Sequence, residues 1–296
     1  MLKKVILICF FFFLSKIFFS QKQSCDTLFL KKIIKTLSSS SFEGRYPGTE
    51  GINKAKYFII NNLDKKIKIL VDTFNYSIDS NFIVTENIIG ILDNKADSFI
   101  IISAHYDHIG YGGKKSRSLK KSVVHPGADD NASGVSVVLS LANYYTKNSV
   151  RKIFKKKYNF IFIFFSGHED GLYGSNSFVN KYKSFLKKTS FVINFDMVGR
   201  LNTYTRNLKL ISNNILFFEK FFNDNNFNLK YSEDFLNTDI SAFIKENIKS
   251  ISLTTGLHED YHKVTDTYDK INYIGICQIL KFVINLINEY SKQRNN

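Results

Sequence analysis

The segment NFIFIFFSGHEDG at residues 159–171 combines an apolar run with a cluster of ionisable residues. Residues 159–166 lack the alternation of polar and apolar positions that marks a half-exposed strand, so we expect a strand covered on both faces. His168, Glu169 and Asp170 follow that strand directly. In open α/β sheets, functional groups gather just past the carboxyl ends of the strands. The segment therefore predicts a buried central strand with a polar site at its end.

Similar strand and helix patterns lie on both sides of this segment. Buried strands that alternate with helices indicate an α/β fold, so we expect a three-layer α/β/α sandwich with a mixed central sheet. One domain over residues 26–290 is expected, because no second boundary is evident in the sequence. The predicted helices span 26–40, 52–64, 133–147, 175–186 and 271–290, and the other predicted strands span 66–74, 86–93, 98–105, 190–196 and 251–256.

The net charge of +15 suggests nucleic acid or an anionic membrane as a partner. However, only six of the 41 basic residues are Arg, the residue better suited to bidentate phosphate recognition. The bias towards Lys, Asn, Ile and Phe is what AT-rich coding would produce. We therefore expect no specific nucleic-acid partner. A nucleic-acid or anionic-surface binder remains an alternative, and strong, salt-sensitive binding would be its signature.

The first twenty residues, MLKKVILICFFFFLSKIFFS, resemble a signal peptide. Two Lys precede an apolar run, and Lys16 interrupts that run, which disfavours a stable membrane span. Cleavage near Ser20–Gln21 would export the protein to the periplasm or the medium, with only transient membrane contact through the signal peptide. A retained N-terminal anchor is the alternative. Cleavage would leave Cys25 and Cys277 as the only cysteines, and the sequence leaves their pairing open.

The six histidines lie in three short segments, and most of them fall where predicted strands end. Five strand ends or adjoining loops each supply His, Asp or Glu to one edge of the sheet. Nitrogen and oxygen donors of this kind suit zinc or a similar divalent ion. Two divalent cations would also neutralise the repulsion among so many carboxylates. These groups are His105 and Asp107, Asp129 and Asp130, His168 to Asp170, Asp196, and His258 to His262.

The motifs at these positions resemble those of the M28 family of di-zinc peptidases, which includes secreted bacterial aminopeptidases. The resemblance covers residues 37–272, with its motifs in the family's order and spacing. It implies a zinc-exopeptidase fold and a metallo-aminopeptidase that hydrolyses peptide or protein substrates with water activated by two Zn²⁺ per chain. The motifs are LSSSSFEGRYPGTEGINKAKYFI (37–59), SAHYDHIG (103–110), PGADDNASGVSVVLSLA (126–142), FFSGHEDGLYGS (164–175), NFDMVGR (194–200) and YHKVTDT (261–267).

The resemblance also implies a role for individual residues. One zinc would take Asp130, Glu169 and His262, and the other would take Asp130, Asp196 and His105. Asp130 bridges the two, because the family's bridging carboxylate lies three residues before the Ser of the PGADDNASG motif, and the peptide bond after it is often cis. Two further residues have supporting roles: Asp107 would accept a hydrogen bond from the second ring nitrogen of His105, and Tyr261 resembles a tyrosine that binds the oxyanion in some relatives.

The position of the family's usual general base is the main departure. The family usually has two consecutive Glu residues before x-Gly-Leu, the first as base and the second as ligand, whereas this chain has His168-Glu169. Imidazole, with an unperturbed pKa of about 6.5, can accept a proton near neutral pH, so His168 is our candidate catalytic base. Two nearby cations would lower its pKa. The alternative is therefore a metal-binding but catalytically impaired homologue that acts as a binding module.

The remaining ionisable residues of these motifs receive ordinary interpretations. His108 and His125 are expected to be exposed loop histidines, and Asp129 and Asp170 are expected to be solvated or to support their neighbours. Asp239 lies in TDISAF, where relatives often have Ser-Asp-His, so that Ile240 replaces a His. Cyclisation of glutaminyl termini, which relatives perform with one zinc, is less expected because this chain retains both ligand sets.

Overall fold

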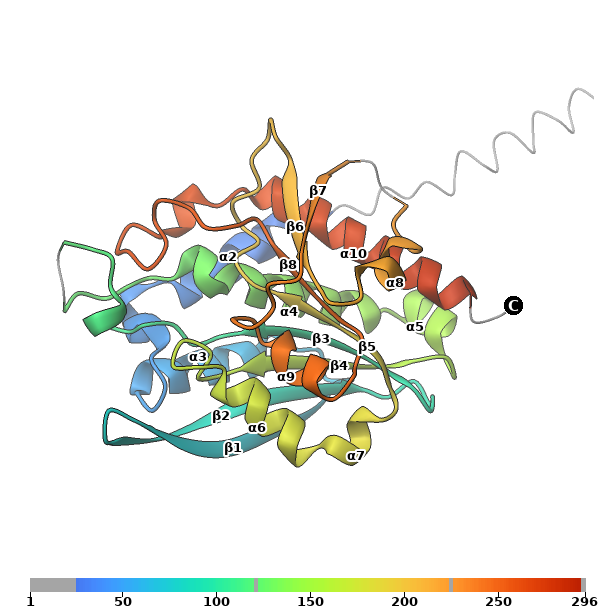
Figure 1. The fold of residues 1–296 in the computed structure, drawn as a ribbon, viewed down its shortest axis with the longest axis horizontal. Helices are drawn as coiled ribbons and strands as arrows, with labels where there is room; N and C mark the ends of the chain where they lie inside the picture. Colours follow the sequence, from blue (N-terminus) through green and yellow to red (C-terminus); the bar gives the residue numbers. More distant parts are fainter. Residues whose placement is uncertain (1–24, 120–121, 224–225, 294–296) are drawn as a thin grey trace, which may run out of the picture.

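The computed structural model describes residues 25–119, 122–223 and 226–293, so the signal peptide expected at 1–20 lies outside the described residues. Within the described residues, eight strands form one mixed sheet in the order β1-β2-β4-β3-β5-β8-β6-β7 (Figure 1). The strands are β1 (Lys68–Ile78), β2 (Asn81–Leu92), β3 (Phe99–His105), β4 (Asn159–Phe165), β5 (Thr189–Phe195), β6 (Asn207–Ile211), β7 (Asn228–Ser232) and β8 (Ser250–Thr254).

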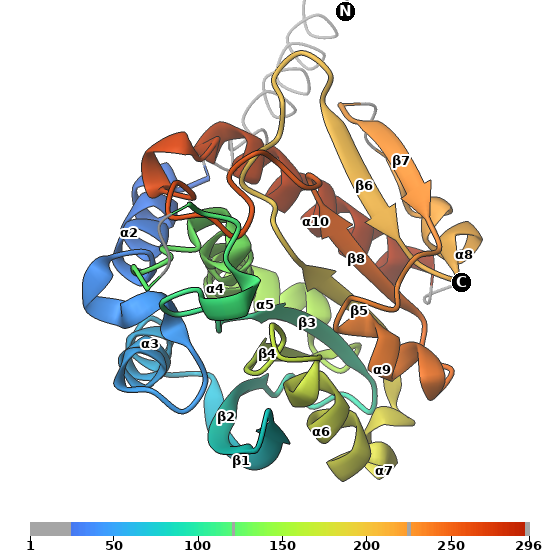
Figure 2. The ribbon, with the colours of Figure 1, turned by 60° about the vertical axis from the view of Figure 1, so that its left-hand side comes forward.

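Helices cover both faces of this sheet, which confirms the three-layer α/β/α sandwich (Figure 2). Helices α2, α3, α4 and α10 pack on one face, and α6, α7 and α9 pack on the other. The α-helices are α2 (Thr27–Leu37), α3 (Glu50–Asn61), α4 (Gly134–Tyr145), α5 (Asn148–Phe154), α6 (Tyr173–Lys181), α7 (Lys183–Leu186), α8 (Ile215–Glu219), α9 (Ile240–Lys245) and α10 (Tyr273–Gln293).

Strand β4 lies between these two layers. Because successive side chains of a strand point to opposite faces, Phe160, Phe162 and Phe164 join the core on the α2 and α4 side. Ile161, Ile163 and Phe165 join the core on the α6 and α9 side. All seven residues of β4 are buried, as the continuous apolar run predicts.

The two ends of the sheet differ more from the sequence-based expectation. Strands β1 and β2 extend beyond the predicted 66–74 and 86–93 and form an antiparallel hairpin. Asp79 and Ser80 join them with φ of 47° and 67°, the left-handed backbone that a two-residue hairpin loop favours. At the other end, β6 and β7 were not predicted. The helix expected at 175–186 is interrupted at Tyr182, between α6 and α7.

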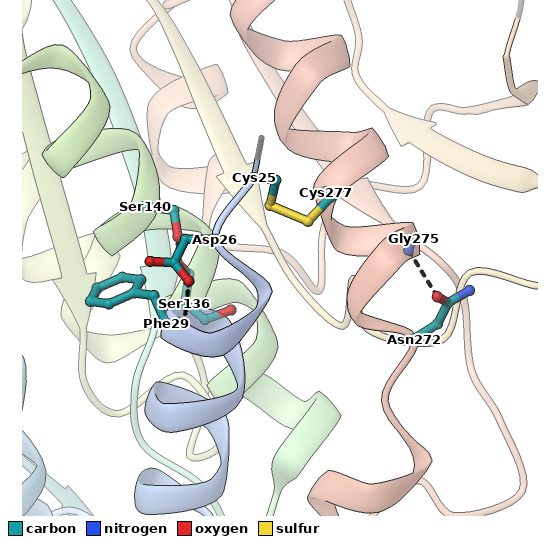
Figure 3. The surroundings of a disulfide bond; sticks show 8 residues. All are labelled: Cys25, Asp26, Phe29, Ser136, Ser140, Asn272, Gly275 and Cys277. Carbon is teal, nitrogen blue, oxygen red and sulfur yellow. Dashed lines mark hydrogen bonds between the residues drawn. A yellow bond between two sulfur atoms is a disulfide. The ribbon is translucent and has the colours of Figure 1, made fainter. Parts of the chain in front are cut away.

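A disulfide bond between Cys25 and Cys277 settles the pairing that the sequence leaves open (Figure 3). It joins the segment just before α2 to the first turns of α10, across 252 residues of sequence. The side chain of Asp26 caps α2 by accepting a hydrogen bond from the backbone N–H of Phe29 at 2.9 Å. Among the described residues, none of the helices combines the length and apolarity that a membrane crossing requires.

The central strands β3, β4, β5 and β8 are mutually parallel neighbours in the order β4-β3-β5-β8. Their carboxyl ends therefore meet at one edge of the sheet. The predicted site residues lie at these four ends or in the segments that follow them, with His105 as the last residue of β3, apart from Asp130, which lies just before α4.

Candidate metal centre

Asp130 lies at the middle of the predicted ligand set. Its Oδ1 is 3.4 Å from Nε2 of His105, and its Oδ2 is 3.2 Å from Nε2 of His262. Nε2 of His105 is also 3.4 Å from Oδ1 of Asp196, and Nε2 of His262 is 3.1 Å from Oε2 of Glu169. The five predicted ligands thus form two three-residue groups that share Asp130.

The backbone around Asp130 is shaped to present this carboxylate. The Asp130–Asn131 peptide bond is cis, as the family resemblance suggests. The side chain of Asn131 donates to the carbonyl of Phe195 at 2.9 Å and accepts from the backbone N–H of Met197 at 3.1 Å, which ties this loop to the end of β5. Gly127 adopts a left-handed φ of 58°, and a Cβ there would lie 2.2 Å from the carbonyl oxygen of Asp130. Glycine is therefore required at this position.

Arg45 supports the same loop and was not identified from the sequence. Its side chain is fully buried and donates to backbone carbonyl oxygens instead of pairing with a carboxylate. Burial lowers the pKa of Arg45 to about 10, against the opposing effect of Asp130 and Asp107. Its cationic charge thus lies close to an acidic cluster. The acceptors are Tyr106 (2.9 Å), Leu37 (2.6 Å), Pro126 (2.8 Å), Gly127 (2.9 Å) and Asp130 (3.4 Å).

Asp107 lies beside His105, but its contacts differ from the prediction. Nδ1 of His105 is closer to the backbone carbonyl oxygen of Asp107, at 3.2 Å, than to the carboxylate Oδ1, at 3.6 Å. The carboxylate instead accepts the backbone N–H groups of His168 at 3.2 Å and Glu169 at 3.1 Å. Asp107 therefore orients His105 mainly through its carbonyl and holds the loop after β4 through its side chain.

His168 faces the half of the site that contains His105 and Asp196. Its ring stacks on that of His105, with centroids 3.8 Å apart and an angle of 6° between the planes. Nδ1 lies 2.9 Å from Oδ2 of Asp239, and Nε2 lies 3.9 Å from Oδ2 of Asp196. Burial and the neighbouring His105 lower the pKa of His168, but Asp239 and Asp196 outweigh both and raise it to about 9.

His108 and His125 are both buried, so the prediction that they are exposed loop histidines is wrong. Nδ1 of His108 lies 3.0 Å from Oε1 of Glu169 and 3.6 Å from Oδ2 of Asp130, within the second group of the site. Burial alone would raise the pKa of Glu169, but the hydrogen bond with His108 and the nearby imidazole of His262 hold it well below its ordinary value. His125 lies farther out, where its ring contacts Ser116 and the carbonyl of Val123.

Tyr261 lies against the second group. Its ring stacks on His262 with centroids 3.9 Å apart, and the guanidinium of Arg117 lies 4.8 Å from the centroid of the Tyr261 ring. Burial and the nearby carboxylates Asp130 and Glu169 raise the pKa of Tyr261 above its ordinary value, so the hydroxyl keeps its proton at neutral pH. A protonated phenol can donate a hydrogen bond, as an oxyanion ligand must.

The neighbouring aspartates have structural contacts. Asp129 accepts the backbone N–H of Gly199 at 2.6 Å and lies 3.1 Å from Nε2 of His258. The side chain of Asp170 is buried and accepts hydrogen bonds from Tyr76 at 2.6 Å and from Lys115. Both therefore support their neighbours, which is one of the two roles expected from the sequence.

The spacing of the donor atoms fits bound zinc. Two ligand atoms at zinc–ligand distances of about 2.0–2.1 Å in a tetrahedral site lie roughly 3.3 Å apart. The nitrogen–oxygen distances within the two groups are 3.4 Å at His105 and 3.1 and 3.2 Å at His262. Nε2 of His262 is also buried without an aligned hydrogen-bond partner among the described residues.

The stacking of His168 on His105 argues against His168 as a further ligand beside His105. The lone pair of an imidazole nitrogen lies in the plane of its ring. Donor atoms of His105, His168 and Asp196 lie close enough together to surround one cation, but two nearly parallel rings with centroids 3.8 Å apart do not direct their lone pairs at a common point. His168 therefore lies beside the ligand set, with its Nε2 on the side that faces Asp196.

Carboxylates and imidazoles that gather at the ends of the parallel strands of an α/β sandwich form an arrangement suited to holding metal ions. The chain belongs to peptidase family M28, whose sequence model matches residues 87–287. Leucine aminopeptidase 2 from Trichophyton rubrum is 26% identical over 259 residues, which cover 71% of this chain and 48% of that protein. The chain spans less than half the length of the curated relatives it matches.

Solved structures share the fold at low sequence identity. A leucine aminopeptidase precursor from Bacteroides thetaiotaomicron superposes with a TM-score of 0.76 at 17% identity, over 89% of this chain and 97% of that chain. A glutaminyl cyclase from the same organism, bound to N-acetylhistamine, superposes with a TM-score of 0.75 at 18% identity over the same shares. The architecture therefore accommodates relatives with either name.

Proposed function

We propose that this protein is an exported aminopeptidase that uses two zinc ions to hydrolyse the N-terminal bond of peptides. The observation that carries the proposal is the position of Asp130, whose two oxygens face separate histidines at 3.4 and 3.2 Å. A carboxylate shared in this way suits a site for two cations. The names of the relatives support the aminopeptidase assignment.

The ligand roles follow from the two groups. His105, Asp196 and Oδ1 of Asp130 would hold one zinc, and His262, Glu169 and Oδ2 of Asp130 would hold the other. When bound, the ions supply Lewis-acid chemistry that polarises the scissile carbonyl and activates water. His108 contacts the second oxygen of Glu169 and helps to hold that carboxylate.

The residues that handle protons are His168 and Tyr261. His168 would accept the proton of the attacking water and return it to the departing amine nitrogen. Tyr261 would donate a hydrogen bond to the carbonyl oxygen as negative charge develops there. Asp107 holds both partners of the His168-Glu169 pair through their backbone N–H groups, so it positions the base and a ligand together.

Export is supported by the Cys25–Cys277 disulfide, because such bonds persist in oxidising compartments and are rare in the cytosol. The basic and apolar pattern of residues 1–20 is consistent with the same route.

The proposal is tested with a pair of aminoacyl-anilide substrates, one with a free amine and one N-acetylated. Zinc-loaded protein should hydrolyse the free-amine substrate only. Asp196→Asn should abolish this activity, while Asp79→Asn, which alters an exposed aspartate paired with Lys114, should keep it. Zinc binding without hydrolysis of either substrate would favour the binding module, and equal hydrolysis of both would exclude an aminopeptidase.

A further inference from the structure

The contact of His168 with Asp239 lies outside the ligand groups. The side chain of Asp239 is 1% exposed and that of His168 is 14% exposed. Oδ2 of Asp239 lies 2.9 Å from Nδ1 of His168. Oδ1 of Asp239 has no hydrogen-bond partner among the described residues. Asp239 directly precedes α9, on the face of the sheet opposite α2 and α4. The buried carboxylate is therefore directed at one ring nitrogen.

This contact fixes which nitrogen of His168 carries a hydrogen. A carboxylate at 2.9 Å accepts a hydrogen bond, so Nδ1 is the donor. In the neutral ring, Nε2 then carries the lone pair on the side facing Asp196, 3.9 Å away. The stacked ring of His105 restricts rotation of the His168 ring out of its plane. Tautomer and ring plane are thus both defined by neighbouring side chains.

We propose that Asp239 is a positioning residue for His168, which holds Nδ1–H so that Nε2 can serve as the proton acceptor in peptide hydrolysis. This inference rests on the proposed function. As water attacks the carbonyl carbon, a C–O bond forms and Nε2 takes the proton of the water. As the C–N bond breaks, Nε2 gives that proton to the amine. The carboxylate stabilises the positive ring between the two transfers, as Asp does in the Ser-His-Asp triad.

The pairing has a consequence for restoring the family's usual Glu at this position. A carboxyl group at position 168 would face the carboxylate of Asp239 inside a buried site, and like charges this close favour one shared proton over two ionised groups. A carboxyl group has no ring nitrogen for Asp239 to hold, so the positioning role described above would be lost. Changing Asp239 should therefore cost much less activity in the His168→Glu background than in wild type.

The experiment compares Asp239→Asn, His168→Glu and the double variant with wild type, with zinc content as a folding control. In the wild-type background, Asp239→Asn should lower kcat by roughly 10²- to 10⁴-fold, by analogy with the same change in the Ser-His-Asp triad, with KM within about threefold and zinc content unchanged. In the His168→Glu background, the same change should alter kcat by less than about threefold, because the contact with the imidazole is absent. Asp234→Asn, at an exposed position just upstream, should change neither value. Equal losses in both backgrounds, or no loss in the first, would overturn the proposal.

A second measurement does not depend on catalysis. Imidazole ¹⁵N spectra of the zinc-free protein above pH 10 report the tautomer of His168 directly. The proposal predicts a protonated Nδ1 in wild type and a shift of the tautomer in Asp239→Asn. An unprotonated Nδ1 in wild type would refute the positioning role, even if the protein hydrolysed no peptide. Conversely, the expected tautomer in an inactive protein would place the failure in the proposed function.

Discussion

Oδ2 of Asp130 lies 3.2 Å from Nε2 of His262, whereas the other oxygen of the same carboxylate faces His105. This single side chain therefore connects two groups of donors that come from different strand ends. Loss of a shared ligand should affect both groups, and loss of an unshared ligand should affect one.

The first prediction concerns zinc content. Asp130→Ala should reduce bound zinc from two equivalents to nearly none, while His105→Ala and His262→Ala should each retain about one, because each removes a ligand from one group. All three should lower kcat/KM by at least roughly 100-fold. Metal analysis after dialysis measures the content. Full zinc content in Asp130→Ala would contradict the shared-ligand arrangement.

The second prediction concerns Arg45, whose guanidinium donates to several buried carbonyls. Lys has a single charged nitrogen, which cannot contact all the carbonyl oxygens that surround the planar guanidinium of Arg45. Arg45→Lys should therefore lower the free energy of unfolding by about 3 kcal/mol or more. Arg151→Lys, which alters a partly exposed arginine, should cost less than about 1 kcal/mol. Similar urea midpoints for the two variants would argue against the role assigned to Arg45.

The third prediction concerns pH and the zinc-free protein. The pKa values of His168 and His262 are raised to about 9 and about 10, from 6.5 when unfolded. For each ring, burial opposes this rise and the neighbouring carboxylates produce it. Raised values mean that the folded state binds protons more tightly, so this stabilisation is complete below pH 6.5 and is lost as the pH rises to 10.

Thermal unfolding of the chelator-treated protein should therefore show a falling Tm between pH 6.5 and 10, which corresponds to several kcal/mol because each pKa unit is worth about 1.4 kcal/mol. His262→Gln should flatten this dependence. The stabilisation gained on zinc binding should show the opposite dependence on pH. Because the ligands must lose their protons before they bind zinc, this stabilisation should grow as the pH rises. A zinc-free Tm that rises over this range would be inconsistent with the ion pairs at the site.

The fourth prediction concerns the disulfide. Cys25→Ser/Cys277→Ser should lower the free energy of unfolding by about 2–5 kcal/mol, because the bond closes a loop of 252 residues in the unfolded chain. Activity at moderate temperature should be unchanged, since neither cysteine contacts the metal centre. A reductant should destabilise the wild type to a similar extent and leave the double variant unaffected. Equal stability with and without the bond would show that it contributes little.

Much of the fold was predictable because the central strands are continuous apolar runs. The run 160–165 can only be buried on both faces, and the structure divides it between two cores. Strands β6 and β7 are five residues long and lie near the edge of the sheet. Their patterns, NLKLI and NLKYS, mix polar and apolar residues too briefly to stand out from a loop. These two strands form because they pair with neighbouring strands of the sheet. A local sequence pattern does not report that pairing.

The positions of the five candidate ligands followed from motifs, each at a strand end or helix start. The contacts that surround these ligands did not follow from motifs. His108 was expected at the surface because it belongs to a loop, yet the loop folds inward and places it against Glu169. Arg45 and Asp239 lie 85 and 71 residues from the groups they contact, Asp130 and His168. Such contacts depend on tertiary packing, which no local pattern reports.

The central claim is an aminopeptidase that requires two zinc ions, and a zinc titration of the metal-free protein tests it most directly. Hydrolysis of a free-amine aminoacyl-anilide should rise with added zinc and reach its plateau at two equivalents, while the N-acetylated substrate remains intact throughout. A plateau at one equivalent, or no hydrolysis of the free-amine substrate at any zinc content, would contradict the claim.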